Sequence, residues 1–258
     1  MTTRIAHIAF NTFREAVRDR VLYNLIFFAL LLVGASLLVG QISIGIERIV
    51  LINLGLTAIS LFGVAIAIFI GIGLVSKEIE KKTLYTILSR PVRRWEFIVG
   101  KFGGLAWTLV VNTSLMAIGF FAALLYSAGS FSRSDGWLLV AIYFIALQFI
   151  VVTALALLFS AFSSPILSAV FTLGLFVIGT FAEDLRAFAG MTQGTTRWLA
   201  TGVAYLVPNF AALNVISSVA HGQPVAGSLV FYNTVYSVFY AAVAISGAVL
   251  IFDRRNLK

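Results

Sequence analysis

The chain has 258 residues, of which 60% are hydrophobic and 11% charged, and its mean hydropathy is +1.03. A chain this apolar uses lipid as its solvent, so the composition excludes a soluble globular domain. The absence of cysteine excludes disulfides and thiolate chemistry, while the formal net charge of +8 raises the question of a nucleic-acid partner.

Residues 3–21 have an amphipathic pattern that predicts a helix lying in the membrane interface. Apolar residues such as Ile5 and Ile8 share one face, and basic residues such as Arg14 and Arg18 lie on the other. Basic side chains on such a helix are attracted to lipid headgroups. A secretory signal is not favoured, because about twenty polar-patterned residues precede the first apolar run and no cleavage site follows it.

Six apolar runs follow, and each is close to the ~20 residues that a bilayer-spanning helix requires. Ser164 and Pro165 make a favourable N-cap and first position for the fifth run. Thr180 and Glu183 have the spacing of a capping box, which predicts a further short helix ending at Gly190. The predicted spans are residues 22–40, 49–75, 102–127, 138–159, 166–182 and 229–252.

The basic residues are distributed unequally between the two sides of the predicted bundle. With six spans, fourteen of the eighteen Lys and Arg residues lie on the side that holds both termini and residues 76–101. By the positive-inside rule this side is cytoplasmic. The net charge is therefore a topology signal, and no nucleic-acid partner is expected.

Residues 76–101 are the most highly charged interruption between two apolar runs. Ser76 can cap a helix, apolar residues recur on one helical face, and Pro91 ends the pattern. An amphipathic cytoplasmic helix that has no membrane to cover is best explained by a groove in a partner protein, although a loop lying on anionic lipid is the alternative. The face comprises Thr83, Leu84, Ile87 and Leu88, with Glu78, Glu80, Lys81 and Arg90 around it.

Residues 183–228 form a sizeable connection on the opposite, external side. Two short helices are predicted there, over Thr195–Val207 and Asn209–Ala220, separated by Pro208 and closed by Gly222. Their aromatic content predicts that they lie in or dip into the outer membrane interface. The segment is too small for a separate domain, so residues 1–258 form one transmembrane domain.

Polar chemistry inside the predicted spans is sparse. No charged residue lies well inside a span, which argues against an ion-coupled antiporter and an aspartyl intramembrane protease. No phosphate-binding loop or hydrolase motif is present, so no catalytic, cofactor-binding or metal residues are predicted. Asn112 and Gln148 lie near the middles of the third and fourth spans, where they either pair across the helices or line a translocation path. In the second span, Gly63, Ala67 and Gly71 form a small-residue stripe that permits close helix approach.

The chain resembles the ABC-2-type permeases, which are membrane subunits of ATP-binding-cassette exporters. The resemblance is most specific between Glu78 and Lys101, although Lys82 stands where the family often has glycine. The segment around Pro208 is also similar to the region before the last span in this family, and the branch with permeases of copper-enzyme maturation systems is nearest. The matching elements are Glu78 and Glu80, then Thr83-Leu84, then Arg90-Pro91-Val92, and then Gly100-Lys101.

The resemblance implies an all-α membrane protein with six transmembrane helices, an N-terminal interfacial helix, a cytoplasmic coupling helix after the second span and short external helices before the sixth. It implies export driven by a separate ATPase subunit, present in two copies, which binds ATP and Mg²⁺. It also implies a second permease copy, in a homodimer or heterodimer, within the lipids of a bacterial cytoplasmic membrane. Two alternatives are a membrane scaffold that recruits a cytosolic partner and a carrier that works without ATP.

Overall fold

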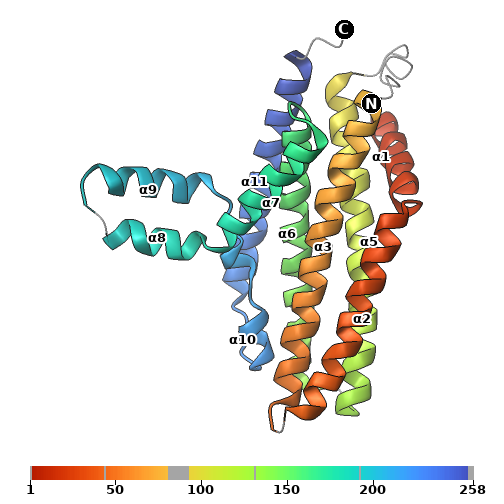
Figure 1. Cartoon of the computed structure of the whole chain (residues 1–258), viewed down its shortest axis with the longest axis vertical. Coiled ribbons are helices and arrows are strands. Elements are labelled where there is room, and N and C mark those ends of the chain that lie inside the picture. Colours follow the sequence, from red (N-terminus) through yellow and green to blue (C-terminus); the bar gives the residue numbers. More distant parts are fainter. Residues whose placement is uncertain (1, 44, 81–92, 131, 192, 255–258) are drawn as a thin grey trace.

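The structure is a computed structural model that describes the chain except for residues 1, 44, 81–92, 131, 192 and 255–258. Over the described residues the secondary structure is helical, with no β-strand. Long helices run side by side in one bundle, and both termini lie at the same end of it (Figure 1). The expected all-α class is confirmed.

The core of the bundle is built around α6 (Gly136–Ser160). This helix packs against α3, α5 and α11. It is apolar on all sides, and it buries residues such as Phe144, Phe149 and Val152 around its circumference, as expected of a helix enclosed by others. The remaining long helices are α2 (Arg20–Ile42), α3 (Glu47–Glu80), α5 (Arg94–Ala128) and α11 (Gly227–Arg254).

These five long helices are each long and apolar enough to cross a membrane. They contain the first, second, third, fourth and sixth predicted spans and extend beyond them at both ends. The described residues also contain two bent helix pairs, so length and composition allow between five and seven crossings.

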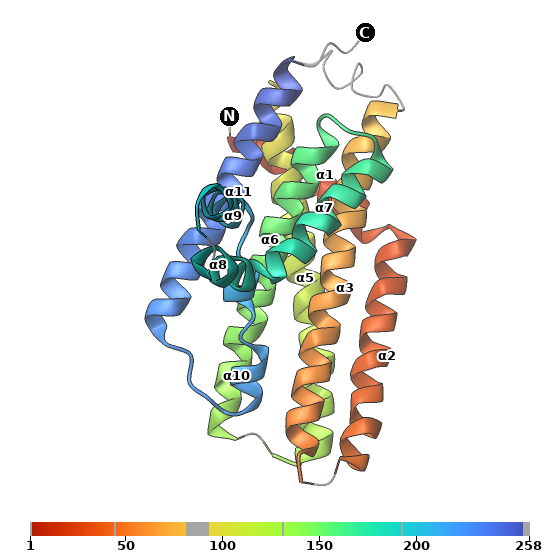
Figure 2. The same ribbon diagram turned by 60° about the vertical axis from the view of Figure 1, so that its left-hand side comes forward.

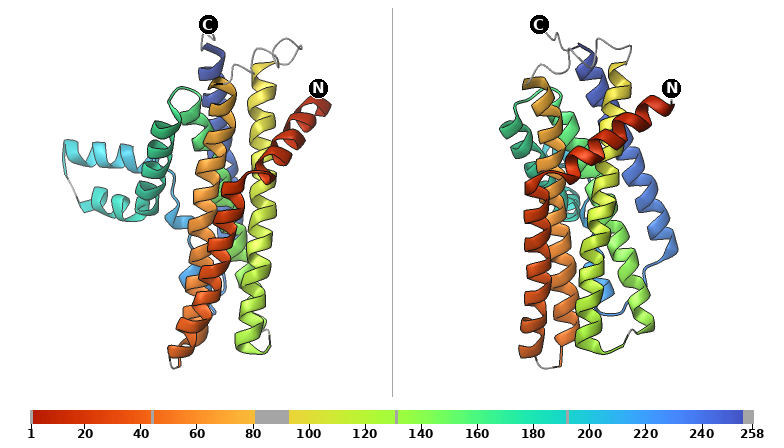
Figure 3. Two further views of the ribbon diagram at one scale, coloured as in Figure 1. Left: turned by 45° about the vertical axis from the view of Figure 1, so that its right-hand side comes forward. Right: turned by 90° about the vertical axis from the view of Figure 1, so that its right-hand side faces the viewer.

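The N-terminal helix α1 (Thr2–Val17) crosses the upper part of α5 obliquely (Figure 3). Two residues, Arg18 and Asp19, separate it from α2 and form the corner between the two helices. The expected helix in this region is therefore present, although it is shorter than residues 3–21.

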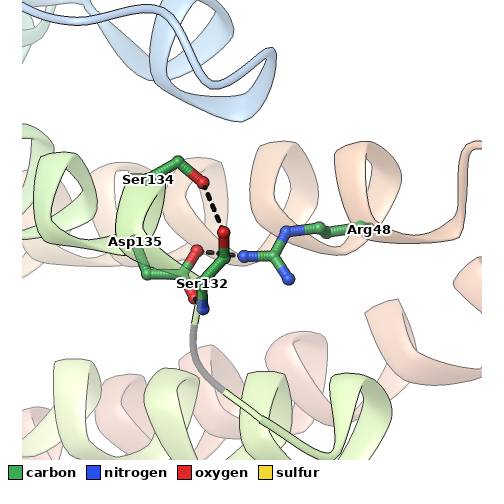
Figure 4. Close-up of polar contacts among 4 residues, drawn as sticks. All are labelled: Arg48, Ser132, Ser134 and Asp135. Carbon is green, nitrogen blue, oxygen red and sulfur yellow. Dashed lines mark hydrogen bonds and ion pairs between the residues drawn. The ribbon is translucent and has the colours of Figure 1, made fainter.

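At the end of the bundle opposite the termini, a polar contact joins the α5–α6 connection to the start of α3 (Figure 4). Arg48 near the start of α3 forms an ion pair with Asp135, which lies directly before α6. The second carboxylate oxygen of Asp135 accepts a hydrogen bond from the backbone N–H of Ser132 at 2.7 Å. Asp135 therefore ties the α5–α6 connection to α3.

The fifth predicted span is interrupted. Ser164 is the N-cap of α7 (Pro165–Thr180) and Pro165 its first residue, which confirms the expected start. The capping box predicted at Thr180 was wrong, because the Thr180 hydroxyl donates to the carbonyl of Val177 at 2.7 Å and this residue ends α7. The short helix predicted to follow it is nevertheless present. The chain then bends by 60° into α8 (Ala182–Met191).

Helices α8 and α9 (Thr195–Leu206) form a hairpin that projects sideways from the bundle in Figure 1 and points toward the viewer in Figure 2. We call this hairpin the arm. The two helices pack on each other, and the Arg186 guanidinium lies 5.6 Å from the ring centre of Tyr205. Trp198 on the arm is 81% exposed.

After the arm, the chain returns into the bundle. The backbone N–H of Phe210 donates to the carbonyl of Gly179 at 3.0 Å, and the Phe210 ring packs on Phe176 of α7. Two short helical turns follow, η2 (Ala211–Leu213) and α10 (Ile216–Ala220), and α10 packs against α3 and α6. The single helix expected over residues 209–220 was therefore wrong. Apolar side chains of this segment, such as Ile216 and Val219, are buried against the two long helices.

Candidate functional site

The predicted coupling region, residues 76–101, begins inside α3 and ends inside α5. The prediction that Ser76 caps a new helix was wrong, because α3 continues through Ser76 to Glu80. Glu78 and Glu80 belong to the last turn of α3. Seven predicted contact residues lie outside the described part of the chain: Lys81, Thr83, Leu84, Ile87, Leu88, Arg90 and Pro91.

The described residues on both sides of this region lie at the end of the bundle that holds the termini. The end of α3, the start of α5 and the N-terminal half of α1 all lie at this end (Figures 1 and 3). A protein that binds residues 81–92 would therefore approach α1 as well.

The start of α5 is stabilised by Glu96. Arg93 has an extended backbone and its N–H donates to the Glu96 carboxylate at 3.0 Å, so Glu96 satisfies a backbone donor at the helix start. Glu96 is only 3% exposed. The sequence pattern did not reveal this cap, because the usual signal has Ser, Thr, Asp or Asn three residues before the glutamate, where this chain has Arg93.

Helix α1 lies against α5 through glycines, in a contact that we call the α1–α5 seam. A Cβ atom added at Gly100 would lie 2.7 Å from the Cβ of Ile8, and one added at Gly104 would lie 2.4 Å from the carbonyl oxygen of Ala9. Both distances are shorter than a non-bonded contact allows. Glycine at these two positions therefore lets α1 approach the backbone of α5 directly.

An ion pair reinforces the seam. The Lys101 ammonium lies 3.5 Å from the Glu15 carboxylate of α1 and 5.7 Å from the ring centre of Phe97. The Lys101 side chain is 4% exposed and that of Glu15 is 48% exposed, so lysine is the buried partner. The Gly100-Lys101 pair singled out in the sequence thus joins α1 to α5 within one turn.

The two polar residues predicted to face each other do not pair. Gln148 donates from Nε2 to the Ser60 hydroxyl of α3 at 3.2 Å. The Asn112 amide nitrogen on α5 is buried and has no hydrogen-bond partner among the described residues. Gln148 therefore joins α6 to α3, because the small-residue stripe brings these two helices together.

The stripe in α3 packs on α6. A Cβ atom added at Gly63 would lie 1.9 Å from the ring of Phe149, and one added at Gly71 would lie 3.2 Å from the Cβ of Ala156. A cavity of about 80 Å³ lies beside Gln148, and Ser60 and Asn214 contribute polar groups to its lining. Its size and polarity suit a few water molecules, since pockets for drug-sized ligands are several-fold larger.

Two comparisons bear on the function. A family model described as ABC-2 family transporter protein matches residues 6–257. The match spans the bundle, the arm and the seam, so the chain belongs to this family. No curated protein matches the chain.

Proposed function

We propose that this chain, as a member of the ABC-2 transporter family, is the membrane-spanning permease subunit of an ATP-driven exporter. A separate nucleotide-binding subunit hydrolyses ATP with Mg²⁺, and this chain provides the route for the substrate. The family match over nearly the whole bundle is the observation that carries the proposal, because it covers helices that individually are merely apolar.

The proposed topology has six crossings with both termini in the cytoplasm. Helices α2, α3, α5, α6 and α11 make five of them, and the fifth in chain order is composite. Its first half is α7, and its second half is the buried return through Phe210 to α10, joined by the hydrogen bond from Phe210 to Gly179. The excess of Lys and Arg at the end with the termini supports this orientation.

The proposed coupling element is the connection between α3 and α5, where the residues from Glu78 to Pro91 contact the ATPase subunit. Both flanking helices are long: 34 residues in α3 and 35 in α5, which correspond to about 50 Å each. A continuous helix of this length moves nearly as a rigid rod. A displacement at the ATPase end therefore reaches the Arg48–Asp135 ion pair at the opposite end.

The seam makes α1 part of this moving unit. Gly100 and Lys101 lie within two turns of the start of α5, so a shift of the coupling element carries α1 with it. We propose that two such subunits, identical or related, assemble with two ATPase subunits in a bacterial cytoplasmic membrane. Asn112 and Gln148 are candidates for the translocation path, and the polar cavity beside Gln148 is the feature that supports this role for Gln148.

The proposal is tested by pull-down of the ATPase subunit and by its hydrolysis rate in reconstituted membranes. The Leu88→Asp variant should lose ATPase binding or stimulated hydrolysis, because a carboxylate in an apolar groove is neither hydrated nor paired. Lys82→Gly is the control and should keep both activities, because the family often has glycine at this position. Membrane insertion should be unchanged in both variants.

The same experiment separates the alternatives. ATPase binding without nucleotide-dependent transport would favour a membrane scaffold. Transport by the chain alone without nucleotide would favour an ATP-independent carrier. Unchanged ATPase binding and hydrolysis in Leu88→Asp would show that the connection between α3 and α5 does not couple ATP hydrolysis to transport and instead lies on the lipid surface.

A further inference from the structure

A groove of about 370 Å³ lies between α1 and α5 beside the seam. Its walls are aromatic and small residues, among them Ala6 and Phe10 of α1 with Gly103 and Trp107 of α5. The volume lies within the range of roughly 300–1,000 Å³ that is usual for small-molecule sites. The groove exists because glycine and alanine leave space that the larger aromatic side chains border.

The groove walls select an apolar occupant. The side chains that line it carry no charge, and Phe10 and Trp107 remain 58% and 62% exposed at its opening. Trp107 has an amphipathic ring of the kind that is favoured at the boundary between headgroups and acyl chains. An extended hydrocarbon chain therefore suits the interior.

One end of the groove carries positive charge. The Arg14 guanidinium on α1 lies 5.8 Å from the ring centre of Phe10, which lines the groove. Arg14 is exposed, as is Arg18 in the corner that follows α1. A guanidinium binds phosphate through two parallel hydrogen bonds, so this end suits a phosphate group.

We propose that the groove binds an acyl chain of an anionic phospholipid, whose phosphate pairs with Arg14. The charge on α1 distinguishes this occupant from a second copy of the chain docked through the same face, which would bring the same arginines against each other. A bound lipid would fill the space between α1 and α5 and hold α1 in the membrane interface. The inference goes beyond the proposed function and does not depend on ATP coupling or on a transported substrate.

Native mass spectrometry of the delipidated full-length protein tests the proposal, with phosphatidylglycerol and phosphatidylcholine of identical acyl chains as probes. The wild type should retain a phosphatidylglycerol molecule in preference to phosphatidylcholine. Arg14→Gln should weaken phosphatidylglycerol binding about fivefold, the effect expected of one interfacial basic residue, and should weaken phosphatidylcholine binding less, because the choline cation already offsets the charge of its phosphate. Arg197→Gln on the distant arm is the charge-matched control and should keep the wild-type preference.

Filling the groove gives an independent test. A Cβ atom at Gly103 would lie 3.7 Å from the Cβ of Ala9, an ordinary contact, so this glycine accepts a side chain. Gly103→Leu should reduce retention of both lipids at least tenfold, whereas Gly103→Ala should keep it. Ala6→Leu fills the groove from α1 and replaces Gly103→Leu if that variant does not assemble.

Three outcomes would overturn the proposal. These are equal binding of the two lipids by the wild type, unchanged retention in both groove-filling variants, and a dimer that dissociates in those variants while lipid binding persists. The last outcome would identify a second copy of the chain as the occupant. A wild-type protein that shows this lipid selectivity but no coupling to an ATPase would contradict only the proposed function.

Discussion

Replacing Gly63 by alanine should destabilise the bundle at the contact between α3 and α6. The added Cβ would lie 1.9 Å from the terminal ring atom of Phe149, whose side chain is fully buried, so the ring or the helices must shift. Overpacking of this kind costs about 1–3 kcal/mol, and an overlap this large belongs near the upper limit. Alanine recovers about 1 kcal/mol of helix propensity, so the net loss is about 2 kcal/mol.

Gly73 in the same helix is a matched control. An added Cβ there meets no atom of the described residues within 4 Å, so Gly73→Ala should gain about 1 kcal/mol from helix propensity alone. The two variants should therefore differ by about 3 kcal/mol, which corresponds to about 6–12 °C in apparent Tm for a chain of this size. The measurement is thermal unfolding of the detergent-purified proteins at one scan rate.

A second-site change tests the stated cause. Phe149→Leu removes the ring atoms that overlap with the added Cβ, so the double variant should be more stable than Gly63→Ala alone. Equal apparent Tm values for Gly63→Ala and Gly73→Ala, or a double variant less stable than either single one, would refute the reasoning.

Three further predictions follow from the seam and the topology. Ala9→Cys with Gly103→Cys should form a disulfide on mild oxidation, because the two Cβ atoms would lie 3.7 Å apart in a chain without other cysteines, and free thiols that persist would argue against the seam. Lys101→Glu should reduce the yield of folded protein, measured by size-exclusion chromatography, because it buries a carboxylate near Glu15, whereas Lys101→Met should be tolerated since Glu15 is half exposed. A cysteine at Ser132 should react with an impermeant reagent from the external side, and labelling only from the cytoplasm would contradict the six-crossing topology.

The helical class and most of the spans were predictable from local pattern. Crossing a membrane requires about twenty consecutive apolar residues, and a run such as 138–159 shows this without knowledge of its neighbours. The start of α7 was equally predictable from local sequence, because Ser164 and Pro165 favour a helix start whatever surrounds them. The end of α3 was not predictable in this way, because Ser76 could cap a new helix but the preceding helix continues through it.

Only the tertiary structure decides which apolar residues are buried against other helices and which stay exposed. Trp198 and Phe210 lie in the same predicted external segment, yet they are 81% and 1% exposed. Hydropathy gives both the same preference, because lipid and protein interior are similarly apolar. The partner of Gln148, the break in the fifth span and the glycine contacts of α1 likewise depend on which helix lies alongside. The pattern of apolar residues along the chain determines the length and the amphipathic face of each helix. Which helix lies beside it is determined by side-chain packing between segments that are distant in sequence.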